Sequence, residues 1–596
     1  MRTRFILLLA ITLLAFTAAV ALAQQPVQTV VVTGTFEPLT LEEIDRSIRV
    51  LPARSQSLVL NSLVDLLRLD PSIDLEERAP GGVQTDVSIR GASFGQTLVL
   101  LNGQRLNDAQ SGHHNMDIPV PLEAVSRVEV LRGSGSTMYG SDAVGGVINV
   151  ITDPPPGFEF RVRTAAGNQG INQQQASTAF GDRKFSEQLS FARDFSSGFL
   201  PDRDYRNLQF ASTTRLVTSL GTSSITAAYM DHPFGADQFY GNFNSWEDTK
   251  TWFAGFEQQI GPQTTASFSF RRHSDLFVLY RDQPEIFTNH HADESYQAAL
   301  RRRQEIASSI TLFYGAEELQ ESIVSNNLGY HSRNREAGYV DLDLRALKRF
   351  SLSVSAREEV YGSSTALSPT VSGAMWLSGK LKFRASGSKA FRIPSYTDLY
   401  YHDPGNVGNP DLRPEQAWTY EAGLDWIPSA KVRGDVTVFQ RRLRDGIDYY
   451  RLSPTDIWQA LNIQNLRFTG VEAALHLAPS RWQAIDLRYT WLEGKQDTVP
   501  LGSTKYTFNY PTNSGVLSWQ MNPKGNFVLR TRVGVVDRRA RDTYVLWDLY
   551  AALSRGKVHP FLQFSNLANT SYQEILGVPM PSRTVIGGVD VLLRKR

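Results

Sequence analysis

Short segments in which apolar and polar residues alternate dominate this chain. In residues 418–426, WTYEAGLDW, every even-numbered residue is aromatic or aliphatic, and every odd-numbered residue is polar or glycine. The same alternation runs through residues 380–388, 471–477 and 584–593. Because successive side chains of a β-strand point to opposite sides, each segment predicts a strand with one apolar and one polar face.

This strand-and-turn texture fills residues 154–596, with no helical stretch between. That length exceeds a single water-soluble sandwich, and aromatic residues such as Trp418 and Trp426 recur at strand ends, where membrane interfaces favour them. A strand of about 10 residues plus its connection gives about 22 strands. We therefore predict a membrane β-barrel of about 22 antiparallel strands. After residue 20 no apolar run is long enough for a membrane-spanning helix.

Residues 41–153 have a different texture, which predicts a compact α+β domain. Residues 62–71 show helical spacing of leucines, and Pro71 ends the pattern. Glycine turns separate short predicted strands, and Asn-Gly at 102–103 indicates a tight hairpin. The prolines in 153–157, DPPPG, mark a boundary, because proline cannot continue a ladder or a helix. A domain of this size is suited to plug the wide lumen of a 22-stranded barrel.

The N-terminus predicts export. Arg2 and Arg4 precede the apolar run of residues 5–20, and Ala-Leu-Ala follows, so residues 1–23 read as a signal peptide, with a single membrane anchor as the alternative. Residues 24–40 are then a linker. The formal net charge of +1 implies no nucleic acid partner. The absence of cysteine excludes a disulfide scaffold, a cysteine zinc site and thiol catalysis.

The glycine-rich stretch 132–152 invites comparison with a phosphate-binding loop. Its spacing fails, because Ser141 stands where a P-loop needs lysine, and Met138 occupies the third glycine of a dinucleotide motif. A β-branched segment follows instead of a helix. These glycines therefore suit tight turns and close packing. No H-E-x-x-H motif and no catalytic constellation is present, so we predict that the protein is not an enzyme and requires no cofactor.

Two long segments resemble the plug motifs of TonB-dependent outer-membrane receptors: SIRGASFGQTLVLLNGQRLN (88–107) and VEVLRGSGSTMYGSDAVGGVINVIT (128–152). Residues 391–401, 408–426, 468–475 and 566–583 resemble their barrel motifs, and the plug is most similar to the cobalamin and colicin receptors. The chain departs from the family in ending DVLLRKR rather than on an aromatic residue.

The resemblance implies a monomeric receptor in the outer membrane of a Gram-negative-type bacterium. It implies uptake of a ferric siderophore, cobalamin or a similar metal chelate, energised through the C-terminal domain of TonB with ExbB and ExbD. An adhesin or binding barrel without transport, a glycan importer and a periplasmic enzyme are the alternatives.

Two groups of residues follow from the resemblance. The first is a candidate TonB box in TVVVTGT (29–35), formed by Thr29, Val30, Val31, Val32 and Thr33. Its β-branched residues favour an extended strand that can pair with a sheet edge of the partner, and a permanently packed plug strand is the alternative. The second is a plug–barrel lock of Arg90 and Arg132 with Glu421 and Glu472. Alternation independently places both glutamates on the polar face; ordinary hydrated lumen charges are the alternative.

Ligand binding is expected at the extracellular tips of the plug and in barrel loops. The candidates are Phe94, His113, His114, Phe239, Tyr240 and Trp246. Because adjacent histidines on a strand point to opposite faces, one pair should not supply two metal ligands, and we predict no metal site. Calcium in the extracellular loops is a candidate through Asp231, Asp237 and Asp248, although these lack the tight spacing of a calcium loop.

Overall fold

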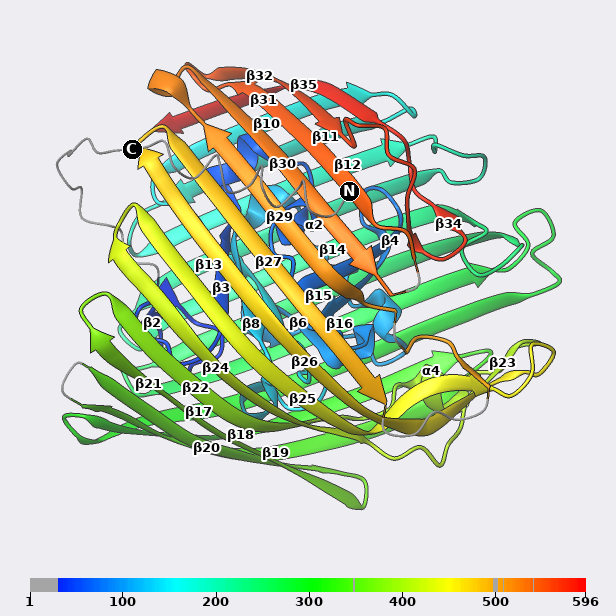
Figure 1. Ribbon diagram of the computed structural model, residues 1–596, viewed down its shortest axis with the longest axis horizontal. Coiled ribbons are helices and arrows are strands. Elements are labelled where there is room, and N and C mark those ends of the chain that lie inside the picture. The colour runs from blue at the N-terminus through cyan, green and yellow to red at the C-terminus, as the bar shows by residue number, and fades with distance from the viewer. Residues whose placement is uncertain (1–29, 347–348, 497–501, 508, 540, 596) are drawn as a thin grey trace, which may run out of the picture.

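The structure is a computed structural model that describes residues 30–346, 349–496, 502–507, 509–539 and 541–595. The predicted signal peptide and the stretch that follows it, up to and including Thr29, lie outside the described residues. Figure 1 shows long strands that run obliquely around a group of short elements from the N-terminal part of the chain.

A closed β-barrel makes up most of the described chain. Successive long strands pair antiparallel, and the last, β35 (Thr584–Lys595), pairs with the first, β10 (Phe158–Gly167), which closes the barrel. Apart from two strands of two residues each, the described barrel has 22 strands, so the predicted architecture is confirmed.

Between these two strands the chain forms, in order, the long strands β11 (Asn172–Gly181), β12 (Phe185–Ser196), β13 (Tyr205–Thr218), β14 (Gly221–Asp237), β15 (Asn244–Ile260), β16 (Thr264–Val278), β17 (Thr288–Ala307), β18 (Ile310–Ser325), β19 (Gly329–Ala346), β20 (Phe350–Tyr361), β21 (Ser364–Ser378), β22 (Leu381–Arg392), β24 (Glu415–Ser429), β25 (Val432–Arg451), β26 (Trp458–Ser480), β27 (Gln483–Gln496), β29 (Pro511–Met521), β30 (Phe527–Arg538), β31 (Tyr544–Leu553) and β32 (Val558–Ser565). The connections between them carry α4 (Tyr396–Tyr400), β23 (Asn406–Val407), β28 (Ser503–Thr504), η6 (Pro523–Gly525), β33 (Gln573–Ile575) and β34 (Val578–Pro579).

The two faces of the strands separate lipid-facing from lumen-facing residues. On β24, Trp418 and Leu424 are 41% and 44% exposed, whereas Glu421 between them is 7% exposed. The apolar face therefore points out of the barrel and the polar face points at the plug, as the alternation predicts. Among the described residues, no helix is long and apolar enough to cross a membrane.

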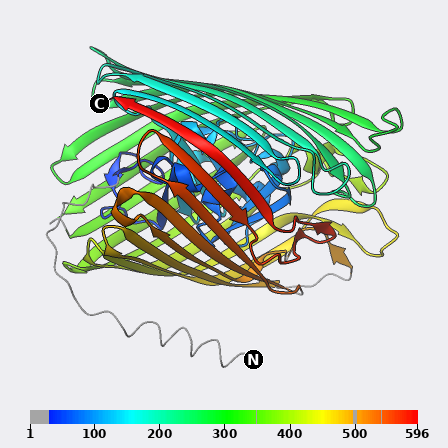
Figure 2. The ribbon, with the colours of Figure 1, turned by 90° about the horizontal axis from the view of Figure 1, so that it is seen from above.

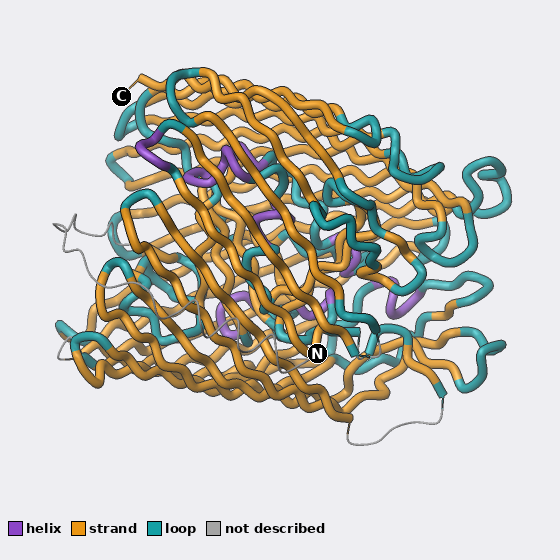
Figure 3. The backbone as a smooth tube through the Cα atoms, turned by 45° about the horizontal axis from the view of Figure 1, so that its top comes forward, coloured by secondary structure: helices purple, strands orange, loops and turns teal. Residues whose placement is uncertain are grey.

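The plug lies inside the barrel, which Figure 2 shows from above, and Figure 3 shows that strands predominate over the chain as a whole. The plug's five-stranded sheet has the order β3 (Ile48–Pro52), β8 (Val125–Arg132), β9 (Gly146–Thr152), β6 (Thr97–Leu101) and β7 (Gln104–Arg105). A separate pair is formed by β4 (Ile73–Ala79) and β5 (Val83–Ile89). The Asn-Gly hairpin predicted between β6 and β7 is confirmed, because Asn102 and Gly103 have φ of 52° and 81°. The described plug elements are β1 (Val30–Val31), β2 (Leu39–Thr40), β3 (Ile48–Pro52), η2 (Arg54–Val59), α2 (Leu63–Leu67), β4 (Ile73–Ala79), β5 (Val83–Ile89), η3 (Phe94–Gln96), β6 (Thr97–Leu101), β7 (Gln104–Arg105), η4 (Gly112–His114), η5 (Leu122–Ala124), β8 (Val125–Arg132), α3 (Ser136–Tyr139) and β9 (Gly146–Thr152).

Glycines of the stretch 132–152 pack closely against neighbouring parts of the plug, as predicted. A Cβ on Gly145 would lie 2.4 Å from the Cβ of Ala92, and one on Gly146 would lie 2.5 Å from the carbonyl oxygen of Leu131. The stretch also contains the four-residue helix α3, which the sequence pattern does not predict. After β9, the prolines of 154–156 lead directly to the first barrel strand.

Candidate functional site

Arg90 joins the plug to the barrel through two glutamates. Its guanidinium donates from Nε and Nη2 to the two carboxylate oxygens of Glu472, at 2.7 and 2.8 Å. Nη1 donates to Oε2 of Glu421 at 2.8 Å. Arg132 also contacts Glu472, with its Nη1 3.0 Å from Oε2, and its Nη2 lies 3.9 Å from Oδ2 of Asp435. The structure thus brings together the four residues of the candidate lock.

The lock is dry. The side chains of Arg90, Glu421 and Glu472 are 1%, 3% and 2% exposed, and the ring of Phe439 lies 4.2 Å from the Arg90 guanidinium carbon. Burial alone would lower the pKa of Arg90, but the two carboxylates raise it, so the guanidinium stays charged. Bidentate arginine–carboxylate pairs are strong and directional, and removing one partner strands a buried charge.

The candidate TonB box is docked on the plug in this structure. β1 pairs antiparallel with β2, and Val31 is fully buried beside Leu39. The backbone N–H groups of Val32 and Thr33 donate to Oε2 of Glu129, at 3.0 and 2.8 Å. A box that binds a partner must therefore first leave this position.

Aromatic side chains from two plug tips and one barrel loop contact one another. The rings of Phe94 and His113, from two plug tips, stack with centroids 4.1 Å apart, and Tyr506 from the loop after β27 meets Phe94 edge-on at 5.2 Å. Nδ1 of His113 lies 2.7 Å from Oδ1 of Asp86. Lys505 is exposed and lies over the Tyr506 ring. Together, Phe94, His113, Lys505 and Tyr506 form a partly exposed surface, which we call the apex surface.

The other loop candidates do not join this surface. Phe239 is buried in an apolar cluster with Val83 and Tyr205. The hydroxyl of Tyr240 bonds Glu247. Trp246 precedes the lumen-facing Glu247 on β15 and therefore lies on the opposite, outer face.

The three calcium candidates are not gathered around an open position. Asp231 and Asp248 both face the ammonium of Lys250, at 3.6 and 2.6 Å, and Asp237 accepts a hydrogen bond from the side chain of Gln238.

His114 points away from the apex surface into the protein. It lies beside Asp117 and the barrel residue His273, with the two imidazole centroids 4.7 Å apart. Burial alone would lower the pKa of His114, but the carboxylates of Asp117 and Asp275 raise it well above its usual value. The same burial would raise the pKa of Asp117, and the two imidazoles hold it below its usual value. The two adjacent histidines thus diverge, although they lie in the 3-10 helix η4 and not on the strand that the prediction assumes.

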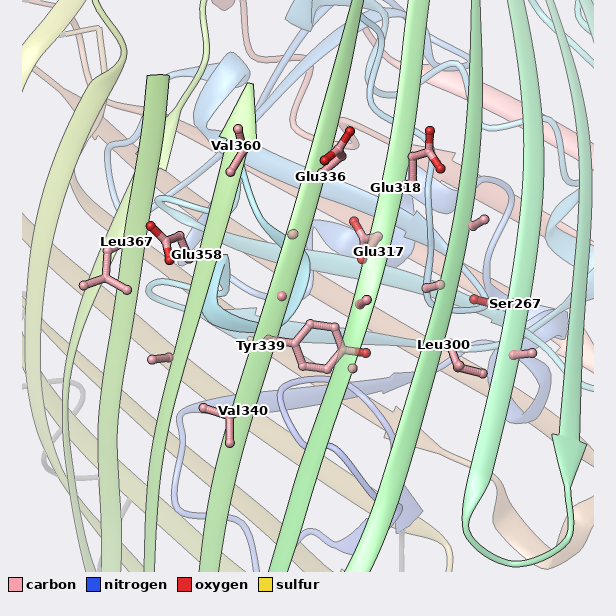
Figure 4. A pocket seen from close by; sticks show the side chains of 18 residues that line it. Ser267, Leu300, Glu317, Glu318, Glu336, Tyr339, Val340, Glu358, Val360 and Leu367 are labelled. Carbon is pink, nitrogen blue, oxygen red and sulfur yellow. The ribbon is translucent and has the colours of Figure 1, made fainter. Parts of the chain in front are cut away.

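A groove on the outer wall of the barrel is separate from these groups. Figure 4 shows Glu318, Glu336 and Glu358 along neighbouring strands. Glu318 and Glu336 are direct cross-strand partners on the outer face, and Glu317, which faces the lumen, is paired with Arg357 instead. Eight of its 18 lining residues are alanine or glycine, whose small side chains leave room between the longer ones. It does not belong to the plug–barrel site.

Comparison with known proteins decides the family. The family described as TonB dependent receptor-like, beta-barrel matches residues 134–566, and the TonB-dependent Receptor Plug Domain matches residues 40–147. The chain belongs to the TonB-dependent receptors. The receptor is therefore an outer-membrane protein of a Gram-negative bacterium.

Relatives extend over most of the receptor. It is 23% identical to the vitamin B12 transporter BtuB of Photobacterium profundum over 572 residues, covering 89% of this chain and 87% of that protein. It is 25% identical to an iron-regulated outer membrane virulence protein of Vibrio cholerae over 582 residues, covering 87% and 86%.

Solved structures share the fold. The FrpB iron transporter of Neisseria meningitidis has a TM-score of 0.78 at 15% identity, covering 92% of this chain and all of that one. The siderophore receptor PirA of Acinetobacter baumannii has a TM-score of 0.76 at 13% identity, covering 93% and 99%.

Sequence reasoning missed several residues of these groups. Asp435 on β25 pairs with Arg49 of the plug at 3.2 Å, and Glu129 holds the candidate TonB box. Alternation places Asp435 on a polar face, but no local pattern tells which plug cation it meets. His273 has only one signal, its place in the alternation of β16.

Proposed function

We propose that this receptor imports a scarce metal chelate or cofactor, of the ferric siderophore or cobalamin class, across the outer membrane. In this proposal a periplasmic TonB C-terminal domain, powered by ExbB and ExbD, pulls on residues 29–33. The pull displaces part of the plug and opens a path through the barrel.

The observation that carries the proposal is the dry lock between plug and barrel. The plug is tied to the wall by buried ion pairs at Arg90, and a ligand can pass only if such contacts are released. Directional polar contacts break over a short displacement, whereas an apolar interface resists separation over its whole area. A protein that only binds ligands at its surface needs no such releasable contact.

Strand addition explains how the pull is applied. β1 has two residues and pairs with β2, which is just as short, so few hydrogen bonds hold the segment. Once free, an extended valine-rich segment can pair with the sheet edge of another protein through its backbone.

The ligand class rests on the relatives and on the apex surface. The two relatives above are named for vitamin B12 transport and for regulation by iron. Aromatic rings, a histidine and an exposed lysine, where the plug tips meet the extracellular loop after β27, suit a large, partly planar, anionic chelate.

The test separates binding from uptake. Val31→Pro removes a backbone donor and disfavours β1 in any sheet, so uptake should cease while binding at the distant apex surface is retained. Binding and uptake of cyanocobalamin and of a ferric catecholate siderophore are measured in cells that lack the native gene and carry each variant. Pro38→Ala, an exposed change outside the box, is the control. Unchanged uptake by Val31→Pro would favour a passive binding barrel.

A further inference from the structure

Two histidines and five carboxylates converge in the interior where the plug meets β15, β16 and β17. The plug contributes His114, Asp108 and Asp117, and the barrel contributes His273, Glu247, Asp275 and Asp293. Each of these seven residues is less than a tenth exposed. The group lies beneath the apex surface, because His114 directly follows His113 in η4.

Asp117 is the centre of the group. Its Oδ2 lies 3.4 Å from Nδ1 of His114 and 3.0 Å from Nε2 of His273. The donor atoms of these three residues lie within 4.8 Å of one another. In a tetrahedral site with metal–ligand bonds of about 2.0–2.1 Å, donor atoms are roughly 3.4 Å apart. The two distances from Asp117 are therefore close to the spacing of ligands on one metal ion.

The outer nitrogens of both imidazoles face further carboxylates. Nε2 of His114 lies 3.5 Å from Oδ2 of Asp275, and Nδ1 of His273 lies 2.8 Å from Oδ2 of Asp108. Metal-binding histidines commonly have a carboxylate beside the ring nitrogen that does not bind the metal, and the two imidazoles are placed in this way. An ordinary buried histidine needs only one such partner.

Charge gives an independent argument. In the described part of the chain, Arg271 is the only arginine or lysine paired with these five carboxylates; it contacts Asp108 at 2.7 Å and Asp293 at 2.8 Å. With all five carboxylates ionised, they outnumber the positive charges of Arg271 and the two imidazoles even when both imidazoles are protonated. Oδ1 of Asp275 and Oδ1 of Asp293 are buried and accept no hydrogen bond from any described residue. Buried negative charge without a counterion is costly, and a divalent cation would offset it.

We propose that His114, Asp117 and His273 bind one divalent transition-metal ion between the plug and the barrel. Two imidazole nitrogens and a carboxylate suit zinc and its first-row neighbours, whereas magnesium and calcium prefer oxygen ligands alone. The ion would bridge the two domains, because two ligands come from the plug and one comes from β16. This site goes beyond the proposed import of a chelate, and it is testable without TonB or the imported ligand.

The full-length receptor is purified in detergent, stripped with a chelator and titrated with Co²⁺, whose visible absorption reports nitrogen and oxygen ligation; Zn²⁺ is then added as a competitor. We expect one equivalent of Co²⁺, displaced by Zn²⁺, and loss of this equivalent in His114→Ala and in His273→Ala. Asp108→Asn should weaken binding about 10- to 100-fold, as changes at residues that orient metal ligands do. His559→Gln is the matched control, because His559 is a buried barrel histidine bonded to the carbonyl of Leu553.

Folding of each variant is checked by the heat-dependent gel mobility of the barrel. Unchanged Co²⁺ binding in folded His114→Ala and His273→Ala, or no stoichiometric binding by the wild type, would overturn the proposal. If either histidine variant does not fold, anomalous diffraction from Zn²⁺-soaked wild-type crystals decides the question. A peak between Nδ1 of His114 and Nε2 of His273 supports the site, and its absence refutes it.

Discussion

Replacing Arg90 by alanine should loosen the plug more than replacing Arg132, the other arginine of the lock. Arg90 makes three hydrogen-bonded contacts with Glu421 and Glu472, and its loss leaves two carboxylates with side chains no more than 3% exposed short of a cation. Breaking a buried pair in this way costs about 3–5 kcal/mol. At 1.4 kcal/mol per factor of ten, plug opening should become roughly 140- to 3,700-fold more frequent. Arg132 makes one contact of 3.0 Å with Glu472, so Arg132→Ala should cost about 1.5–3 kcal/mol.

The absence of cysteine in the chain makes the assay direct. Ser136 in α3 is fully buried, and its hydroxyl has no partner among the described residues, so Ser136→Cys is a nearly isosteric reporter. Its thiol reacts with a maleimide only when the plug opens, and the rate in increasing urea gives the free energy of opening.

Arg90→Ala should accelerate labelling more than Arg132→Ala. Removing Glu421 as well as Arg90 should recover part of the loss, because Glu421 then no longer lacks its cation and Glu472 keeps its contact with Arg132. A change of less than about 1 kcal/mol in Arg90→Ala, the level of an exposed ion pair, would refute the reasoning.

Two further predictions concern the plug. Glu129→Ala leaves the backbone N–H groups of Val32 and Thr33 without their acceptor, so hydrogen–deuterium exchange of this segment should accelerate about 10- to 100-fold; an unchanged rate would mean that Glu129 does not hold the box. Gly145→Ala would place a Cβ within 2.4 Å of that of Ala92 and should destabilise the plug by about 1–3 kcal/mol in the urea assay. Gly338→Ala, with nothing within 4 Å of the new Cβ, should stay within about 0.5 kcal/mol, and equal effects of the two changes would contradict the packing argument.

The barrel was predictable because the side chains of a strand alternate with a period of two residues and its two faces meet different surroundings. Lipid outside and a polar plug inside force alternation on every strand, so Trp418 and Glu421 could be assigned to opposite faces from one nonapeptide. The four-residue helix α3 was not predictable, since it is too short to show a helical period.

The sites were predictable only in part. The four residues of the lock could be named from the family resemblance, and the alternation placed its two glutamates on the lumen-facing side of their strands. The group around His114 could not, because His273 is 156 positions from Asp117 and only the closed barrel brings them together. Nor does the sequence of residues 30–33 say whether the segment is docked or free, because a strand that pairs with the plug and one that pairs with a partner need the same residues.

If a ligand can pass only when the plug separates from the barrel wall, then locking the plug to the wall must stop import. Thr137 of α3 and Thr370 of β21 have hydroxyl oxygens 2.6 Å apart, so cysteines at both positions are placed to form a disulfide. In cells that carry Thr137→Cys together with Thr370→Cys, we expect the oxidised receptor to bind cyanocobalamin or the ferric siderophore without importing it, and a reductant to restore uptake. Undiminished import through the fully cross-linked receptor would contradict the account.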